Sequence, residues 1–148
     1  MRHPHRHYQL IQQLYVLIDD QDRRILGEFG LNASQYRLLM LLNPTDGQRL
    51  TTLSSRLLLS KSTVTRAVDQ LEQFGWVRRV ADPTDRRAQR VLLTPAGDRQ
   101  REAISEAHWQ AHQKWFDTLT KQEQREVEAL LAKLCTGLLG SSEDAVVS

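Results

Sequence analysis

Apolar residues recur at intervals of three and four along most of this chain, which is the spacing of α-helices with one buried face. The stretch 60–75 shows the pattern most clearly, because its other positions are mainly hydroxyl-bearing and polar residues. Ser60 suits an N-cap, and Gly75 suits the left-handed position that ends many helices. A helix is therefore predicted here, with an apolar stripe of Val64, Ala67, Val68 and Leu71.

A β-hairpin is predicted directly after this helix. The runs 76–81 and 90–93 are rich in β-forming residues, and a polar turn containing Pro83 separates them. A hydroxyl-rich helix can approach base edges closely, and an arginine-tipped hairpin beside it can reach a neighbouring groove. With a helix over about 32–42 and a short one from about residue 51 in front, the order predicts a winged helix-turn-helix.

Three further helices are predicted, at about 8–29, 95–118 and 120–139, and residues 140–148 are expected to form a loose tail. Each helix carries an apolar stripe. A winged part of about 60 residues cannot cover all three stripes, because small domains bury limited surface. The two ends of the chain are therefore expected to pack against a second copy. Capping-box patterns mark two helix starts, at Asn32–Gln35 and Thr120–Glu123.

Composition sets the broad class. With 148 residues, 40% of them hydrophobic, the chain is expected to form one domain with a substantial core. No apolar run approaches the length of a membrane span, and the N-terminus lacks the apolar block of a secretory signal. A single cysteine is typical of a reducing compartment, so a cytoplasmic protein is expected. Catalytic motifs are missing, so we expect neither enzymatic activity nor a cofactor.

Charge is distributed unevenly along the chain. The net charge is only +2, but the region from Arg49 to Arg101 holds eleven of the 20 basic residues and five of the 18 acidic ones. This basic middle suggests a face that binds a polyanion, although a solvated charged surface would show the same imbalance.

The central stretch also resembles the MarR family of bacterial transcription regulators, in residues given at the end of this paragraph. The resemblance extends over nearly the whole chain in helix order and length. It implies a mainly α (α+β) fold, with a winged helix-turn-helix at about 32–94 and dimerisation helices at about 8–30 and 95–139. It also implies a homodimer. The matching residues are Ser62-Thr63-Val64-Thr65-Arg66, Leu71-Glu72, Gly75, Asp85-Arg86-Arg87, Leu93-Thr94 and Gly97.

Base readout is expected from the side of the recognition helix that faces away from its apolar stripe. Arg66 can make a bidentate contact to a guanine edge, and Lys61 lies at the helix start, near enough to a phosphate. The alternative is that the hydroxyl groups only cap the helix or bond the preceding turn. The candidate DNA-binding residues are Lys61, Ser62, Thr63, Thr65 and Arg66.

In the wing, the resemblance implies that Arg87 enters a minor groove and that Asp85 braces it. Narrow minor grooves attract cations, and an arginine held by a carboxylate loses less entropy when it inserts. Arg86 and Arg90 are then candidates for phosphate contacts. A surface salt bridge would explain the pair of Asp85 and Arg87, but not three arginines around one turn.

The resemblance further implies an effector pocket between the winged part and the dimerisation helices, often for small aromatic or phenolic anions. Such aromatic residues also dominate cores and interfaces, which is the alternative interpretation. The candidates are Tyr15, Tyr36, Arg37, Trp109 and Trp115.

Two further features bear on sensing. His108 and His112 are four residues apart on one helical face, which is metal-ligand spacing. Some relatives sense zinc, but no cysteine or third histidine follows nearby, so a metal-sensing regulator is kept as an alternative. Cys135 on the last helix is expected to be a buried, inert thiol.

Together the patterns and what the resemblance implies predict a ligand-responsive repressor that binds palindromic double-stranded DNA as a homodimer. An effector would respace the two recognition helices and weaken DNA binding. Two alternatives stay open. One is a winged-helix module that contacts proteins without sequence-specific DNA binding. The other is an enzyme whose winged portion serves only dimerisation, and the short chain argues against it.

Overall fold

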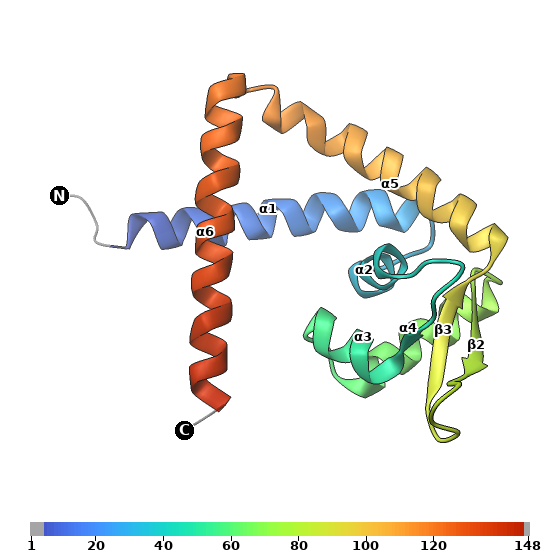
Figure 1. The fold of residues 1–148 in the computed structure, drawn as a ribbon. Helices are drawn as coiled ribbons and strands as arrows, with labels where there is room; N and C mark the ends of the chain where they lie inside the picture. The colour runs from blue at the N-terminus through green and yellow to red at the C-terminus, as the bar shows by residue number, and fades with distance from the viewer. Residues whose placement is uncertain (1–4, 147–148) are drawn as a thin grey trace. The chain divides into compact units, whose positions relative to one another are not determined.

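The computed structural model describes the backbone of residues 5–146 and the side chains of residues 5–141 (Figure 1). Internal contacts divide the chain into two compact units, residues 1–108 and 109–148. The winged part predicted for residues 32–94 lies wholly within the first unit. No helix within residues 5–146 is both long and apolar enough to span a membrane.

The elements follow in the predicted order. The first part of the chain forms α1 (Arg6–Glu28), α2 (Ala33–Leu41), β1 (Gln48–Arg49), α3 (Leu50–Leu57) and α4 (Lys61–Gln73). It is followed by β2 (Val77–Ala81), β3 (Gln89–Leu93), α5 (Pro95–Phe116) and α6 (Lys121–Val146).

The three strands form one antiparallel sheet in the order β1-β3-β2. Val77 pairs with Leu93 and Ala81 pairs with Gln89, so β2 and β3 form the predicted hairpin, with residues 82–88 at its tip. The short strand β1 pairs with β3 through Gln48 and Val91. A helix-turn-helix followed by this hairpin is a winged helix-turn-helix, so the predicted fold class is confirmed (Figure 1).

The core of the first unit lies between the helix-turn-helix and the sheet. The predicted stripe of α4 is buried, with Val64, Val68 and Leu71 all inaccessible to solvent. Leucines from α2 and α3 pack against it, because α4 is in contact with both helices. The remaining buried core residues include Leu26, Leu38, Leu39, Leu53, Val77, Val91, Leu93 and Ile104.

Helix ends follow the predicted local signals. Asn32 and Gln35 form a complete capping box at α2, and the Ser60 hydroxyl accepts the Thr63 N–H at α4. The Thr120 hydroxyl accepts the Glu123 N–H at 3.2 Å, and the Glu123 carboxylate accepts the Thr120 N–H at 2.7 Å. Hydrogen bonding of the Glu123 carboxylate by Thr120, chiefly through the Thr120 N–H, lowers the pKa of Glu123.

Two expectations for the last helix are wrong. Residues 140–146 do not form a loose tail, because α6 continues to Val146, while residues 147–148 lie outside the described part. Cys135 is exposed rather than buried. It lies on a helix whose leucines are themselves largely exposed in the single chain, so nothing in the second unit covers it.

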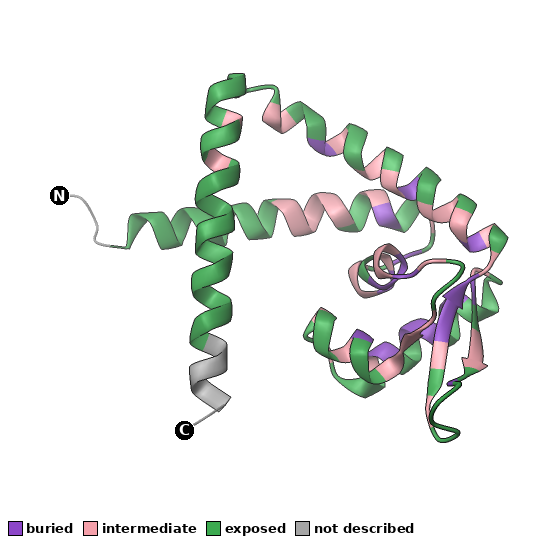
Figure 2. Ribbon diagram, in the orientation of Figure 1, coloured by how far each residue is buried: buried purple, intermediate pink, exposed green. Residues whose placement is uncertain are grey.

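Most residues of α6 and of the N-terminal half of α1 are exposed (Figure 2), and many of them are large and apolar. On α1 they are Tyr8, Leu10, Ile11, Leu14, Tyr15, Val16 and Leu17, which are between 42% and 62% exposed. On α6 they are Leu130, Leu131, Leu134, Leu138 and Leu139. Such continuous apolar surfaces are uncommon on soluble monomers and usually mark interaction sites.

Candidate nucleic-acid interface

Burial of the α4 stripe determines which side chains α4 presents to solvent. Lys61, Ser62, Thr65 and Arg66 are exposed, as their spacing predicts, whereas Thr63 is only partly so. The Ser60 hydroxyl lies 2.8 Å from the Thr63 hydroxyl and 3.1 Å from the Ser62 hydroxyl. The capping alternative therefore applies to these two hydroxyls, and Thr65 and Arg66 are the exposed side chains beyond the first turn.

The wing tip carries two exposed arginines, Arg86 and Arg87. Among the described residues, Asp85 forms no side-chain ion pair with Arg87, so the expected bracing of the guanidinium is wrong. The Asp85 carboxylate instead accepts the backbone N–H of Arg87 at 3.0 Å. The bond bends the chain at the tip, because an aspartate two residues before an N–H closes a turn. Asp85 thus shapes the backbone that carries the arginine.

Arg90 does not lie at the tip. Its Nε donates to Asp82 Oδ2 at 2.7 Å, and its guanidinium also donates to the Gly47 carbonyl at 3.2 Å. The side chain is partly buried at the wing base, where its charge is matched by Asp82. Asp82, which the sequence patterns did not single out, is the acceptor for several neighbours, and these hydrogen bonds hold its pKa far below the usual range.

The two predicted halves of the interface meet at one hollow. Lys61 and Thr65 of α4 line it from one side, and Arg86 and Arg87 of the wing line it from the other. The charges at its rim are mainly positive, which suits a negatively charged backbone. Its lining is completed by Arg49, Leu50, Thr51, Asp85, Ala88 and Gln89.

A second hollow lies on the other flank of α4. Arg66 and Thr63 line it together with Ser34 at the start of α2. The exposed ridge of α4 is therefore bordered on both sides by hollows that contain arginine and hydroxyl groups. A helix seated in a major groove is bordered by a sugar–phosphate strand on each side, so this arrangement matches a duplex.

Arg79 of β2 joins the wing to the recognition helix. Its guanidinium pairs with Asp69 and, at 2.9 Å, with Glu72, both on α4. Its backbone N–H also donates to Glu72 at 3.2 Å. These bonds keep the hairpin beside α4. The sequence offered no signal for them, because the partners lie seven and ten positions apart and belong to different elements.

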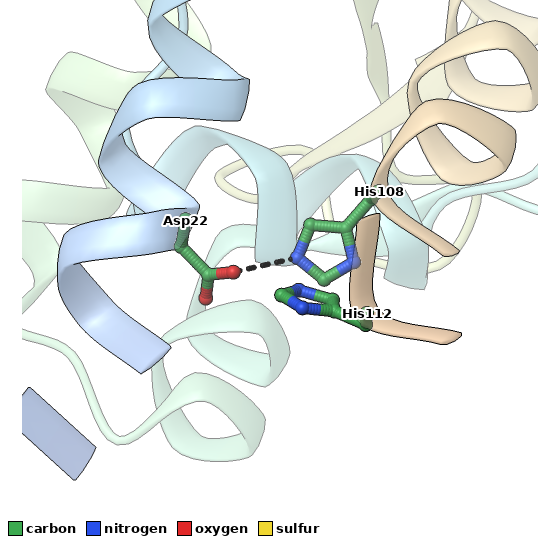
Figure 3. A group of neighbouring side chains, drawn as sticks. All are labelled: Asp22, His108 and His112. Atoms are coloured by element: carbon green, nitrogen blue, oxygen red, sulfur yellow. Dashed lines mark hydrogen bonds and ion pairs between the residues drawn. The ribbon is translucent and has the colours of Figure 1, made fainter. Parts of the chain in front are cut away.

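The histidines flagged for metal binding have an acidic neighbour that spacing alone missed (Figure 3). His108 Nε2 lies 2.9 Å from Asp22 Oδ1 of α1, and its ring stacks on Tyr36 with 4.7 Å between centroids. His112 follows one turn later on the continuous helix α5. The three side chains offer two imidazole nitrogens and a carboxylate oxygen within 4.8 Å of one another. Burial and Asp22 raise the pKa of Tyr36.

The other effector-pocket candidates lie in different settings. Tyr15 and Arg37 are exposed side chains of the first unit. Trp109 lines a mainly apolar hollow of the second unit with Phe116 and Val127, and Trp115 packs edge-on against His112. Of these candidates, Tyr36 is in contact with His108. The effector pocket stays a prediction.

Comparison with known proteins agrees with this architecture. The MarR family model matches residues 31–88, from the start of the helix-turn-helix to the wing tip. The HTH-type transcriptional regulator YkoM of Bacillus subtilis (strain 168) is 30% identical over 126 residues, which cover 85% of this chain and 82% of that protein. The transcriptional repressor MprA of Escherichia coli (strain K12) is 28% identical over 134 residues, which cover 88% of this chain and 75% of that protein.

A solved structure adds the three-dimensional match. The crystal structure of a MarR transcriptional regulator from Methanosarcina mazei Go1 aligns with a TM-score of 0.80 and 26% identity. The alignment covers 89% of this chain and 95% of that one. Since sequence relatives and folds agree across most of the chain, this protein belongs to the MarR family and is a DNA-binding transcription regulator.

Proposed function

We propose that the protein is a ligand-responsive repressor that binds palindromic operator DNA as a homodimer. One observation carries the DNA-binding part of the proposal. Side chains from α4 and from the wing tip, which are separate in sequence, line a single basic hollow. In the proposed complex, α4 lies in a major groove and the wing follows the adjacent minor groove.

Each side chain has a distinct part in this proposal. Arg66 and Thr65 read base edges, because they are exposed on the face of α4 opposite its buried stripe. Lys61 and Arg86 contact phosphates, and Arg87 enters the minor groove. Ser62 and Thr63 contact the DNA close to the helix start, where their hydroxyls also surround Ser60. Arg90 supports the wing from its base.

The homodimer follows from the apolar surfaces of α1 and α6. Leu14 and Leu17 on α1 and Leu134 and Leu138 on α6 are each more than half exposed in the single chain. A second copy offers the same surfaces, so a two-fold contact would bury them without any other partner. Two recognition helices related by that axis would read two half-sites of a palindrome.

The DNA proposal is tested by titrating the protein against the DNA upstream of its own gene over a range of salt. The control is a fragment of equal length from within the coding region. A specific binder should prefer the upstream DNA, and log affinity should fall with log salt by about 0.9 per phosphate contact. Equal, weak binding to both fragments would instead support a module for protein contacts.

The proposed effector is a small aromatic or phenolic anion that binds near Tyr36. A specific observation favours a second candidate, a divalent transition-metal ion at Asp22, His108 and His112. Two imidazoles and a carboxylate are a ligand set that zinc accepts, with a position left for water or another donor. The competing interpretation is that Asp22 and His108 form an ordinary ion pair packed against Tyr36.

Calorimetric titration with Zn²⁺ separates the two interpretations. The wild type should bind one equivalent per chain, His112→Ala should lose this binding, and the control His7→Ala, at an exposed position of α1, should keep it. If His112→Ala and the wild type bind Zn²⁺ equally, the metal candidate is wrong. Operator affinity measured with and without Zn²⁺ then tells whether binding regulates the protein.

A further inference from the structure

Asp82 is the one acidic side chain that is buried within the described part of the chain, with only 3% of the residue exposed. It follows the last residue of β2 and begins the wing turn. A buried carboxylate is costly unless its charge is paired and its oxygens accept hydrogen bonds. The groups that surround the Asp82 carboxylate therefore indicate its role.

Six donor groups form hydrogen bonds to this carboxylate, and a seventh hydrogen bond, from the Asp82 N–H, closes the turn. Arg49 donates through Nε at 2.8 Å and Nη2 at 3.0 Å, and Arg90 donates through Nε at 2.7 Å. The Thr84 N–H and hydroxyl donate at 2.9 and 2.7 Å, and the Asp85 N–H donates at 3.0 Å. The Asp82 N–H donates to the Ala88 carbonyl at 3.0 Å.

These donors come from parts of the protein that must be aligned for DNA binding. Arg49 ends β1 and is the residue before α3, so it belongs to the helix-turn-helix. Arg90 lies on β3, on the far side of the wing turn. Thr84 and Asp85 lead directly into Arg86 and Arg87. One carboxylate thus links the helix-turn-helix, the outgoing strand and the backbone that carries the tip arginines.

Such a cluster contributes more to geometry than to stability. Replacing a buried ion pair by well-packed apolar residues is often neutral or even stabilising, because desolvation offsets much of the attraction. The directional bonds, in contrast, allow only one orientation of the turn. The contacts of Arg79 with α4 hold the hairpin base in the same way, which leaves the direction of the tip to Asp82.

We propose that Asp82 is a positioning residue for DNA binding, which orients the wing tip so that Arg87 reaches the minor groove and Arg86 a phosphate while α4 lies in the major groove. The inference rests on the proposed function, because it assigns how that interface is aligned. It also assigns a role to Arg49 and Arg90, because both arginines donate hydrogen bonds to the Asp82 carboxylate. A phosphate contact was predicted for Arg90, and the proposal gives it this supporting role instead.

A double-mutant cycle with operator DNA tests the proposal. Asp82→Asn keeps the size of the side chain but offers one carbonyl oxygen instead of two carboxylate oxygens. We expect about tenfold weaker operator binding and a smaller salt slope. In the Asp82→Asn background, Arg87→Ala should cost much less than in the wild type, because the arginine is already misplaced. Hydroxyl-radical protection should disappear under the wing and persist under α4.

Asp46→Asn is the matched control, because it removes one negative charge from an exposed loop of the same unit. It should bind at least as tightly as the wild type. If Asp82→Asn does not fold, as judged by circular dichroism, Thr84→Val keeps the carboxylate and both arginines and removes only the Thr84 hydroxyl, which donates to Asp82 and accepts from Arg49 Nη2 at 3.0 Å. It should show the same pattern with a smaller loss.

The outcomes separate this inference from the proposed function. If the wild type does not prefer operator DNA, the proposed function itself fails. If the wild type binds and Arg87→Ala weakens binding, but the effects of Asp82→Asn and Arg87→Ala simply add, only the positioning role is overturned. Loss of protection under α4 and the wing together would likewise contradict it, because a purely structural role predicts that result.

Discussion

At the scale of single residues, Gly97 shows how closely α5 approaches the wing. A Cβ atom at this position would lie 1.9 Å from the Trp76 carbonyl oxygen. The neighbouring Thr94 hydroxyl donates to the Gly75 carbonyl at 2.6 Å and accepts the Gly97 N–H at 3.0 Å. Glycine is therefore required here for close packing, and the Leu-Thr-x-x-Gly pattern at the end of the wing acquires a physical explanation.

Gly97→Ala should destabilise the protein by roughly 1–3 kcal/mol, because the added methyl group must displace backbone rather than a flexible side chain. Urea unfolding monitored by circular dichroism measures the change. Gly27→Ala is the control, since a Cβ there meets nothing within 4 Å, and it should leave stability unchanged or slightly raised. Equal stability of the Gly97→Ala variant and the wild type would show that α5 can move away from Trp76.

Asp82 also predicts how stability responds to acid. An ordinary aspartate titrates near pH 3.8, and hydrogen bonds from Arg49, Arg90 and Thr84 lower the pKa of Asp82 in the folded state. Because the pKa is lower in the folded state, the ionised Asp82 carboxylate contributes its full share to the free energy of unfolding above about pH 4. This contribution is lost as the pH falls further. The midpoint of thermal unfolding should thus fall less steeply between about pH 4 and pH 2 in Asp82→Asn. Parallel curves for both proteins would contradict this.

At the scale of elements, α4 and the wing divide the work of recognition. The stripe of Val64, Val68 and Leu71 anchors α4, so its opposite face is presented at a constant angle. The wing is anchored twice, through Arg79, which pairs with α4, and through Asp82, which pairs with Arg90. Base readout and groove insertion therefore depend on different side chains, and substitutions in the two elements should have different effects.

Arg87→Ala should weaken binding to all operator variants alike, because a minor-groove cation reads width and charge more than sequence. Arg66→Ala should instead change the preferred sequence and cost about 1–3 kcal/mol at a position where it reads guanine. Binding measured against a set of single-base operator variants distinguishes the two profiles. Identical profiles for both variants would contradict the division of roles, and unchanged affinity in both would refute the interface.

At the scale of the whole molecule, the apolar surfaces of the terminal helices are the dominant unexplained feature of the single chain. The exposed leucines of α6 recur at helical spacing over two turns, and α1 repeats the pattern in the other unit. A second copy is the partner that the proposed function requires, since a palindrome is read by two related subunits.

Leu134→Glu places a charge in the middle of the α6 leucines and should shift the protein from dimer to monomer, together with a loss of operator binding. Sedimentation velocity at several concentrations measures the shift. Thr136→Glu is the control, because at 100° per residue it lies on the opposite side of α6 from Leu131, Leu134 and Leu138. A Leu134→Glu protein that stays dimeric would locate the dimer contact elsewhere.

The sequence by itself determined the features that depend on neighbours a few residues away. Helical spacing predicted the buried face of α4, and the capping residues Asn32, Ser60 and Thr120 marked helix starts, because a cap bonds within its own first turn. The order of helices and hairpin then predicted the winged fold. Spacing also indicated the candidate side chains of α4, since a buried stripe leaves the other face exposed.

Only the tertiary structure decided which distant side chains meet. Asp82 receives Arg49 from 33 positions away, and His108 meets Asp22 from 86 positions away. The tertiary structure also pairs Arg90 with Asp82 at the wing base. The Asp85 carboxylate accepts the backbone N–H of Arg87 instead of its guanidinium. Periodicity reports which face of an element is apolar, but the choice among charged partners depends on how the elements pack, and that is a property of the folded chain.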